Sequence, residues 1–349
     1  MRAFVTGGGG FVGSFLCAHL AASGDEVIAP FVDITEPALI AAAICDAAPD
    51  AVYHLAGQAD VSRSWADPAE TFTINVLGTL NVVSAVCQLR LKPRVLIVSS
   101  GEVYGLIEPD ELPVRETHTL RPASPYGASK ASAEFAALQA FHGRQVPVIV
   151  ARPFNHIGPG QSDAFIVSAV ARAIAEAEAA GGGEIAVGNL AAARDFSDVR
   201  DVVRAYRACV ERGTAGATYN VCSGTAVRIS ELVDRLVALA ERPLRVAVDP
   251  ERFRPSDVPV IVGDASRLRA ETGWTAERKA AIPAPAAIVE LAVGDRESLA
   301  RWARIQPGLL HPVNREELDR IRGKIAADGV RSLTAIEREF MERFAALAG

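Results

Sequence analysis

The sequence predicts an α/β fold in which a doubly wound parallel sheet is followed by a smaller α/β lobe and a helical C-terminal extension. Short apolar runs alternate with helical patterns over about the first 150 residues, which is typical of a parallel sheet with helices on both faces. A glycine-rich turn joins the first apolar run to the first helical pattern. At 349 residues the chain exceeds one typical domain, so we expect two packed lobes or one large domain with additions.

Charge and cysteine content favour a small-molecule ligand. The net charge of −6 and the isoelectric point of about 5.6 argue against nucleic-acid and anionic-membrane partners, which select basic surfaces. The five cysteines show no Cys-x-x-Cys spacing and no Cys/His cluster, so we expect reduced thiols, a cytoplasmic protein and no metal. We expect no signal peptide, and we find no apolar run long enough to span a bilayer.

The first strand, residues 2–6, runs directly into a glycine turn. Its glycines have Gly-x-x-Gly-x-x-Gly spacing, at Gly7, Gly10 and Gly13. A helix over 14–23 and a second strand over 26–29 follow, and this order is the context of a Rossmann-type dinucleotide fingerprint. The glycines let backbone N–H groups approach a pyrophosphate, which rests at the positive end of the helix. We therefore expect the turn, with Phe11 and Val12, to bind a dinucleotide.

The end of the second strand leaves the choice between NAD and NADP open. An acidic residue at this place commonly binds the adenosine ribose, but residues 29–31 include neither a carboxylate nor an arginine. The next candidates are Asp33 and the adjacent Ile34, in a segment so short that Asp33 could instead belong to the following element and face the adenine.

The elements that follow continue the alternation. We expect helices over residues 36–48, 71–88 and 126–141, and strands over residues 51–57, 95–99 and 146–152. Ligands of such sheets bind outside the carboxyl ends of the strands. Small residues end the third strand, where a cofactor passes close, and Ser100 and Glu102 follow the fourth strand.

Tyr126 and Lys130 form a Tyr-x-x-x-Lys pair at the start of a predicted helix. Residues four apart on a helix are neighbours, so the Lys130 ammonium can stabilise the Tyr126 phenolate. A phenol with an ordinary pKa of about 10 is a weak acid near neutrality, and an adjacent cation makes it a better proton donor. The pair is therefore a candidate acid/base centre.

The chain resembles the extended short-chain dehydrogenase/reductase family of nucleotide-sugar enzymes over roughly residues 2–278. Five segments carry the resemblance: Thr6 to Gly13, His54 to Gly57, Ser99 to Gly105, Tyr126 to Lys130 and Arg152 to Gly160. Within the family it is most similar to the GDP-4-dehydro-6-deoxy-D-mannose reductases. The segments that indicate this group include Phe154 to Gln161, Val187 to Leu190, Arg194 to Phe196, Asp198 to Val202, Tyr219 to Gly224 and Arg254 to Pro259.

The resemblance implies a role for each matching residue. Ser100, Tyr126 and Lys130 match the catalytic triad. Glu102 occupies the place of the base that removes the C5 proton in dehydratases, but related reductases carry it too, and it could equally be a hydrogen-bonding carboxylate at the edge of the cleft. The implied cofactor-binding residues are Gly7, Gly10, Phe11, Val12, Gly13, Asp33, Ile34, Leu55, Ala56, Gly57, Asn75, Ser99, Tyr126, Lys130, Pro153 and Phe154. The implied substrate-binding residues are Glu102, Asn155, Val187, Arg194 and Arg254.

The activity implied by the resemblance is reduction by NAD(P)H of the C4 ketone of a nucleotide-linked 4-keto-6-deoxy sugar, of the GDP-4-dehydro-6-deoxy-D-mannose to GDP-D-rhamnose type. A 4,6-dehydratase or a 4-epimerase would use the same triad, and a non-catalytic dinucleotide-binding scaffold is the alternative outside enzymes. The chain lacks the arginine-containing insertion of GDP-mannose dehydratases and the Cys/His pair of the fucose-forming epimerase-reductases. Both differences favour simple ketone reduction.

The predicted organisation has three parts. Residues 1–155, with a return segment at about 188–210, form the NAD(P)-binding domain, and residues 156–281 form a substrate-binding lobe. Residues 282–349 form a helical extension, which either packs on the body or docks a partner. By analogy with the family, we expect a homodimer that pairs the helices over 71–88 and 126–141 into a four-helix bundle.

Overall fold

The computed structural model describes residues 1–250 and 258–278, together with five isolated positions beyond residue 317. The chain divides into two compact units, Met1–Ile282 and Pro283–Gly349, and the elements named below all belong to the first. Arg254 and the helical extension that we predict over residues 282–349 lie outside the described residues, apart from those five positions.

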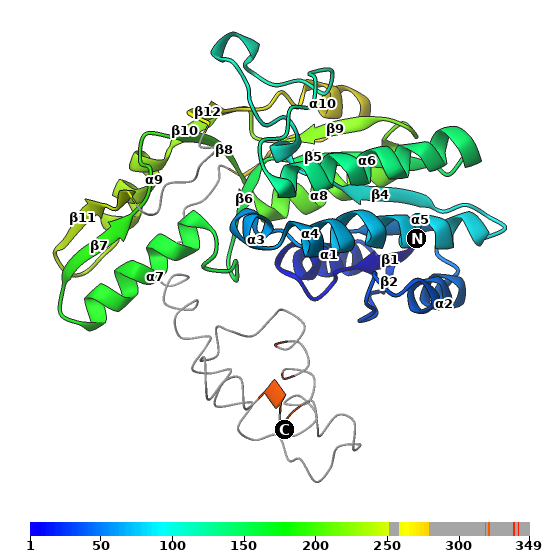
Figure 1. Cartoon of the computed structure of the whole chain (residues 1–349), viewed down its shortest axis with the longest axis horizontal. Helices are drawn as coiled ribbons and strands as arrows, with labels where there is room; N and C mark the ends of the chain where they lie inside the picture. The colour runs from blue at the N-terminus through cyan, green and yellow to red at the C-terminus, as the bar shows by residue number, and fades with distance from the viewer. Residues whose placement is uncertain (251–257, 279–317, 319, 322–337, 339–340, 342–349) are drawn as a thin grey trace. The chain divides into compact units, whose positions relative to one another are not determined.

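The main sheet has six parallel strands in the order β2-β1-β3-β4-β5-β9 (Figure 1). The strands are β1 (Arg2–Thr6), β2 (Glu26–Ile28), β3 (Ala51–His54), β4 (Arg94–Val98), β5 (Val148–Pro153) and β9 (Thr218–Val221). The predicted doubly wound parallel sheet is confirmed. The strand order reverses beside β1, and ligands bind at the carboxyl edge of such a switch point.

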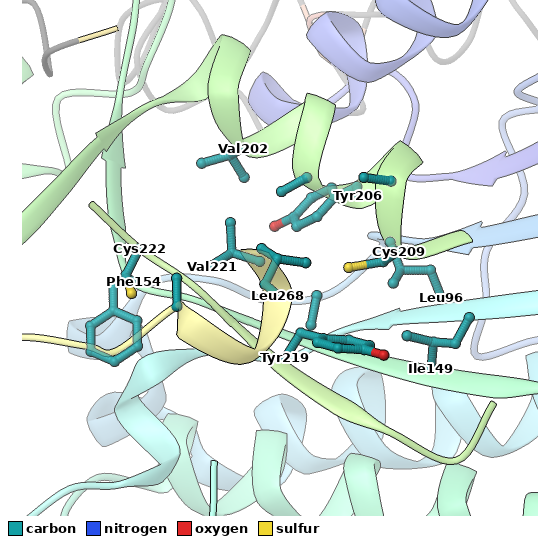
Figure 2. Close-up of a cluster of buried hydrophobic side chains, with 14 of the residues drawn as sticks. Leu96, Ile149, Phe154, Val202, Tyr206, Cys209, Tyr219, Val221, Cys222 and Leu268 are labelled. Atoms are coloured by element: carbon teal, nitrogen blue, oxygen red, sulfur yellow. The ribbon is translucent and has the colours of Figure 1, made fainter. Parts of the chain in front are cut away.

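Helices cover both faces of this sheet. On one face α1 (Phe11–Ala22) packs against α8 (Val199–Arg212), and on the other α5 (Gly78–Gln88) packs between α2 (Pro37–Ala47) and α6 (Pro125–Arg144). Successive residues of a strand point to opposite faces, so the strand side chains divide between two buried clusters. Figure 2 shows part of the cluster under α8, where Leu96 and Ile149 lie beside Cys209.

The return of the chain to the main sheet extends further than we predict. The return segment expected at about 188–210 includes most of α8, which packs on β4 and β5. The chain then adds β9 to the sheet beside β5, a strand that our prediction places inside the substrate-binding lobe. The predicted boundaries at residues 155 and 281 stay predictions.

The segment Pro68–Gln88 differs from the single helix that we predict over 71–88. It consists of α4 (Pro68–Phe72), a π-helical turn (Thr73–Leu77) and α5. By length and composition it could cross a membrane, which corrects the statement that no apolar run is long enough. Core helices of soluble proteins have the same composition, and here α5 packs between α2 and α6.

The smaller lobe contains two further sheets, which confirms the predicted second α/β part (Figure 1). One has the order β10-β8-β12, with β6 also paired to β8, and the other pairs β11 with β7. The strands are β6 (Asn155–Ile157), β7 (Gly183–Val187), β8 (Ala193–Asp198), β10 (Ala226–Arg228), β11 (Leu244–Val248) and β12 (Val260–Ile261). The helices are α7 (Ile166–Ala179) and α9 (Ile229–Val237).

Candidate active site

A cavity of about 800 Å³ lies at the carboxyl edge of the main sheet, between that edge and the smaller lobe. Its volume suits a small-molecule or cofactor site. The predicted site residues that line it are Val12, Leu55, Gly57, Ser99, Ser100, Glu102, Tyr126, Lys130, Pro153, Phe154, Asn155, Val187 and Arg194. The structure thus brings the predicted acid/base residues and most of the predicted substrate residues together. The predicted residues that do not line it are Gly7, Gly10, Phe11, Gly13, Asp33, Ile34, Ala56 and Asn75.

The glycine turn has the geometry that a pyrophosphate needs. Gly7 has φ of +71°, which favours glycine, and the N–H of Gly10 donates to its carbonyl oxygen at 3.0 Å. A Cβ on Gly13 would lie 2.0 Å from the same oxygen, so no larger residue fits. Gly10 is the N-cap of α1, whose first turn contains no acidic residue. The positive end of α1 therefore remains available to an anion, and these residues fit the pyrophosphate of a dinucleotide.

Tyr126 is held at the start of α6 by a well-formed helix cap. Ser124 Oγ accepts from the N–H of Gly127 at 3.0 Å, and the N–H of Tyr126 donates to Ser64 Oγ at 3.1 Å. Burial raises the pKa of Tyr126 to about 12, a hydrogen bond with Ser100 opposes this rise, and the charge of Glu102 adds to it. The phenol is therefore protonated at neutral pH and can donate a proton into the cavity.

Lys130 lies one turn further along α6 and is anchored to the main sheet. Its Nζ donates to the carbonyl oxygen of Val98 at 2.8 Å. Burial lowers the pKa of Lys130 to about 8, and the charge of Glu134 opposes this. Burial, the hydrogen bond with Ser100 and the charge of Glu102 account for the change in the pKa of Tyr126 among the described residues. From the spacing of the two residues we also expect the Lys130 charge to lower this pKa. Such an effect of Lys130 is not found.

A buried ion pair joins α6 to β5 one helical turn after Lys130. Glu134, one turn after Lys130, accepts from Arg152 Nε at 2.9 Å and from its Nη2 at 2.6 Å. Ser99 Oγ also donates to Glu134, so its hydroxyl is used within the protein. The Arg152 guanidinium lies 4.9 Å from the centre of the Tyr104 ring and donates to the Tyr104 hydroxyl at 3.0 Å. This network joins α6 to the carboxyl ends of β4 and β5.

Asn75 lies behind the cavity wall, on the π-helical turn. Its Oδ1 accepts from the N–H of Gln58 at 2.8 Å, and its Nδ2 donates to the carbonyl oxygen of Gln58 at 3.0 Å and to Ser129 Oγ at 2.9 Å. A Cβ on Gly57 would lie 2.8 Å from Asn75 Oδ1, so the chain needs glycine there. Asn75 therefore positions the loop after β3 against α6. Its predicted contact with a cofactor stays a prediction.

Asp33 and Ile34 lie away from the cavity. Asp33 is exposed, and its Oδ1 accepts from the N–H and the hydroxyl of Thr35 at 2.8 and 2.7 Å. Ile34 is buried against α5, where a Cβ on Gly78 would lie 2.5 Å from its Cδ1. Their predicted place beside the adenosine end of the cofactor stays a prediction.

The smaller lobe supplies the opposite wall. Arg194 lines the cavity from β8, and its Nη1 donates to the carbonyl oxygen of Ala193 at 2.9 Å. The next residue, Asp195, is buried and accepts from the N–H and the hydroxyl of Ser223 at 2.8 and 2.6 Å and from the N–H of Gly224 at 2.9 Å. These bonds fix the end of β8 from which Arg194 projects. A guanidinium there suits recognition of a diphosphate.

Two buried polar residues of the cavity wall, Gln161 and Tyr206, are not among the predicted site residues. Gln161 Nε2 donates to the carbonyl oxygen of His156 at 2.9 Å, which leaves its Oε1 without a partner among the described residues. Tyr206, on α8, also has an unpartnered buried hydroxyl. Gln161 ends a segment that carries the family resemblance, which was a usable signal. Tyr206 lies on the apolar face of α8, and the sequence pattern there indicates a core residue.

Comparison with known proteins agrees with this geometry. A family model described as GDP-mannose 4,6 dehydratase matches residues 30–281. The GDP-6-deoxy-D-mannose reductase of Pseudomonas aeruginosa is 41% identical over 281 residues, which is 79% of this chain and 92% of that protein. Residues 282–349 lie beyond the segment that the family model matches.

Solved structures give the same result with cofactors bound. RMD from Pseudomonas aeruginosa complexed with NADPH has a TM-score of 0.76 and 38% identity, over 83% of this chain and 99% of that one. The UDP-glucose 4-epimerase of Thermus thermophilus in complex with NAD has a TM-score of 0.74 and 27% identity, over 84% and 99%. Among the described residues, no group of His, Cys, Asp and Glu could hold a metal ion. The chain therefore belongs to the extended short-chain dehydrogenase/reductase family, within the group of the GDP-mannose 4,6-dehydratase model, and is an NAD(P)-dependent nucleotide-sugar oxidoreductase.

Proposed function

We propose that this enzyme reduces the C4 ketone of a GDP-linked 4-keto-6-deoxy sugar with NAD(P)H, as a GDP-4-dehydro-6-deoxy-D-mannose reductase does. The observation that carries the proposal is the convergence of Ser100, Tyr126 and Lys130 on one cavity that begins beside a pyrophosphate turn. The 41% identity to a GDP-6-deoxy-D-mannose reductase supports the choice of substrate class.

The protonation state of Tyr126 supports reduction. The bound dinucleotide supplies the hydride. As negative charge develops on the ketone oxygen, Tyr126 donates its proton to that oxygen and the Ser100 hydroxyl gives a second hydrogen bond. A pKa of about 12 keeps Tyr126 protonated and ready to donate. Lys130, which is held by the carbonyl oxygen of Val98 and lines the same cavity, is proposed to stabilise the tyrosinate that remains. The product is the C4 alcohol, and the hydride and the Tyr126 proton account for both of its new hydrogens.

Glu102 acts in this proposal as an electrostatic neighbour of Tyr126. Its carboxylate lines the cavity and raises the Tyr126 pKa, which disfavours loss of the proton before the ketone arrives. In a dehydratase the same glutamate would remove the C5 proton. We favour the first role because the reductase relative is 41% identical to this chain, whereas a GDP-mannose 4,6-dehydratase of Vibrio cholerae is 25% identical.

The substrate diphosphate is proposed to contact Arg194, with Asn155 and Val187 on the same wall. Arg254 is proposed as its second arginine on the resemblance alone. The guanine base is likewise proposed from the relatives, and binding assays with GDP-, UDP- and dTDP-sugars would test it.

A cofactor balance tests the proposed reaction. Purified enzyme, incubated with the 4-keto-6-deoxy sugar linked to GDP, is expected to oxidise one NADPH or NADH for each sugar consumed. Comparison of the two cofactors at equal concentration also identifies the preferred one. Consumption of GDP-mannose without added reductant would instead identify a dehydratase and contradict the proposal.

We also propose a soluble, cytoplasmic homodimer. Large apolar side chains stay exposed on the helices that would form its four-helix bundle, with Leu77 52%, Leu80 37% and Phe135 66% exposed. Pairing with a second copy would cover them and would explain the apolar character of Pro68–Gln88. Light scattering is expected to give a dimer for the wild type and a monomer for Phe135→Glu, and a monomeric wild type would contradict the proposal.

A further inference from the structure

Trp65 presents a large, half-exposed aromatic side chain to the cavity. The residue is 48% exposed and lies on α3 (Val61–Ala66), a short helix between β3 and α4. It lines the same cavity as Ser100 and Tyr126. Covering a large apolar side chain is favourable, so an exposed indole inside a ligand cavity indicates a surface that the ligand covers.

One face of α3 borders the cavity. With about 3.6 residues per turn, Trp65 falls between Val61 and Ser62 around the helix axis. These three residues line the cavity, whereas the other three residues of α3 do not. Arg63, on the opposite side of the helix, donates from Nε to Glu70 Oε2 at 2.9 Å. The indole of Trp65 is therefore at the centre of the face of α3 that borders the cavity.

A hydrogen bond ties this helix to Tyr126. Ser64 is buried, and its Oγ accepts from the N–H of Tyr126 at 3.1 Å. Asp60 caps the helix, since its Oδ1 accepts from the N–H of Ser62 at 2.7 Å. Trp65 follows Ser64 directly, so Trp65 and Tyr126 line the cavity from neighbouring backbone positions. A sugar whose C4 oxygen contacts the Tyr126 hydroxyl therefore occupies the end of the cavity that Trp65 borders.

The proposed substrate carries an apolar group next to its reacting carbon. In a 4-keto-6-deoxy hexose, C4 is bonded to C5, and C5 carries the C6 methyl group. This methyl group is two bonds from the carbon that accepts the hydride, and only contact with an apolar surface removes it favourably from water. Among the large apolar side chains described at the cavity, the exposed ones are Trp65 and Phe165. Phe165 is 38% exposed and precedes α7, in the smaller lobe.

We infer that the Trp65 indole covers the C6 methyl group of the sugar and so determines a preference for 6-deoxy over 6-hydroxy sugars. The inference rests on the proposed function, since it takes a GDP-linked 6-deoxy sugar as the ligand. Trp65 contacts the substrate but takes no part in hydride or proton transfer. Phe165 belongs to the lobe in which we propose that Arg194 contacts the diphosphate.

Two nucleotide sugars that differ only at C6 test this contact. GDP-mannose carries a hydroxyl group on C6, whereas GDP-D-rhamnose, which is GDP-6-deoxy-D-mannose, carries none. Their dissociation constants and that of GDP are measured by calorimetry without added cofactor. The wild type is expected to bind GDP-D-rhamnose about tenfold more tightly than GDP-mannose, because a hydroxyl group loses its hydration against an apolar surface.

Trp65→Ala is expected to abolish this tenfold preference and to leave the affinity for GDP unchanged. Trp65→Phe keeps part of the aromatic surface and is expected to keep part of the preference. Because Trp65 is half-exposed and alanine favours helices, the melting temperature of Trp65→Ala is expected to match that of the wild type.

Phe165→Ala is the matched control. It removes a similarly exposed aromatic side chain that lines the same cavity from the smaller lobe. The ratio of the dissociation constants for GDP-mannose and GDP-D-rhamnose is expected to stay as in the wild type.

Three results would overturn the inference. Equal binding of the two sugars by the wild type, or an unchanged preference in Trp65→Ala, would exclude the contact with the methyl group and leave the proposed function intact. An equal loss of affinity of Trp65→Ala for GDP and for both sugars would place the indole against the nucleotide instead. Failure of the wild type to bind GDP or either sugar would overturn the proposed function and the inference with it.

Discussion

The two walls of the cavity are built differently. On the side of the main sheet, Lys130, Glu134 and Arg152 are buried or half-buried and bonded to fixed partners on the neighbouring strands and helix. On the side of the smaller lobe, strands of two to six residues present Asn155 and Arg194, which are partly or largely exposed. The proposed chemistry, which needs sub-ångström placement, is thus located on the wall whose side chains have fixed partners, called the rigid wall below. The proposed recognition of the nucleotide is located on the more exposed wall.

The largest expected effect is on the rigid wall, at Tyr126. Tyr126→Phe removes only the proton donor, so kcat is expected to fall by a factor of about 10² to 10⁴, while the dissociation constant for the cofactor stays near that of the wild type. Steady-state kinetics and calorimetry measure the two quantities. Turnover within a few-fold of wild type would exclude Tyr126 as the acid.

Breaking the buried ion pair tests whether the same wall depends on its support. Glu134→Gln leaves the Arg152 guanidinium buried without its charged partner, so the free energy of unfolding is expected to fall by about 3–5 kcal/mol. Glu70→Gln breaks the more exposed pair between Glu70 and Arg63 and is the control, with an expected loss of about 0–1 kcal/mol. If denaturant titrations showed the same loss of unfolding free energy for Glu134→Gln and Glu70→Gln, the buried pair would not stabilise the protein more than the exposed pair.

The smaller lobe is expected to control affinity for the substrate more than the chemical step. Arg194→Ala removes a charged hydrogen-bond donor proposed to contact the diphosphate, so KM is expected to rise about tenfold or more while kcat changes less. Arg194→Lys keeps the charge without the planar fork and is expected to give an intermediate KM. A fall in kcat with unchanged KM would assign Arg194 to the chemistry instead.

His54, at the end of β3, is expected to make the stability of the folded protein depend on pH. Thr79 Oγ1 donates to the carbonyl oxygen of Asn75, so it accepts from His54 Nε2, and His54 Nδ1 accepts from Thr6 Oγ1. This neutral ring is buried, and burial lowers its pKa from 6.5 to about 3. Between these values the unfolded chain binds more protons than the folded one.

Stability is therefore expected to be fully present above pH 6.5 and to fall as the pH decreases toward 3. His54→Gln, a neutral replacement, is expected to be less stable at pH 7 and to lose part of this dependence. Thermal unfolding between pH 4 and 8 measures the slope. An unchanged slope in the variant would show that other groups cause it.

Much of the rigid wall could be predicted because its signals are local in sequence. The alternation of strands, the spacing of Gly7, Gly10 and Gly13, and the four-residue interval between Tyr126 and Lys130 are all short-range patterns. The Glu134–Arg152 pair could not be predicted, because it joins two elements, α6 and β5, whose contact the sequence pattern does not show. The π-helical turn at Asn75 was missed for a similar reason, since tertiary bonds to Gln58 and Ser129 hold it.

The direct transfer of hydride to C4 is the most decisive point to measure. The enzyme would be given the GDP-linked 4-keto-6-deoxy sugar and NAD(P)H carrying deuterium on either face of C4 of the nicotinamide ring, and the product examined by NMR. For one of the two labelled cofactors, one deuterium is expected at C4 of each sugar formed, with one cofactor oxidised. A product without deuterium from either cofactor, or conversion that leaves the added cofactor unoxidised, would contradict ketone reduction and indicate an epimerase or a dehydratase.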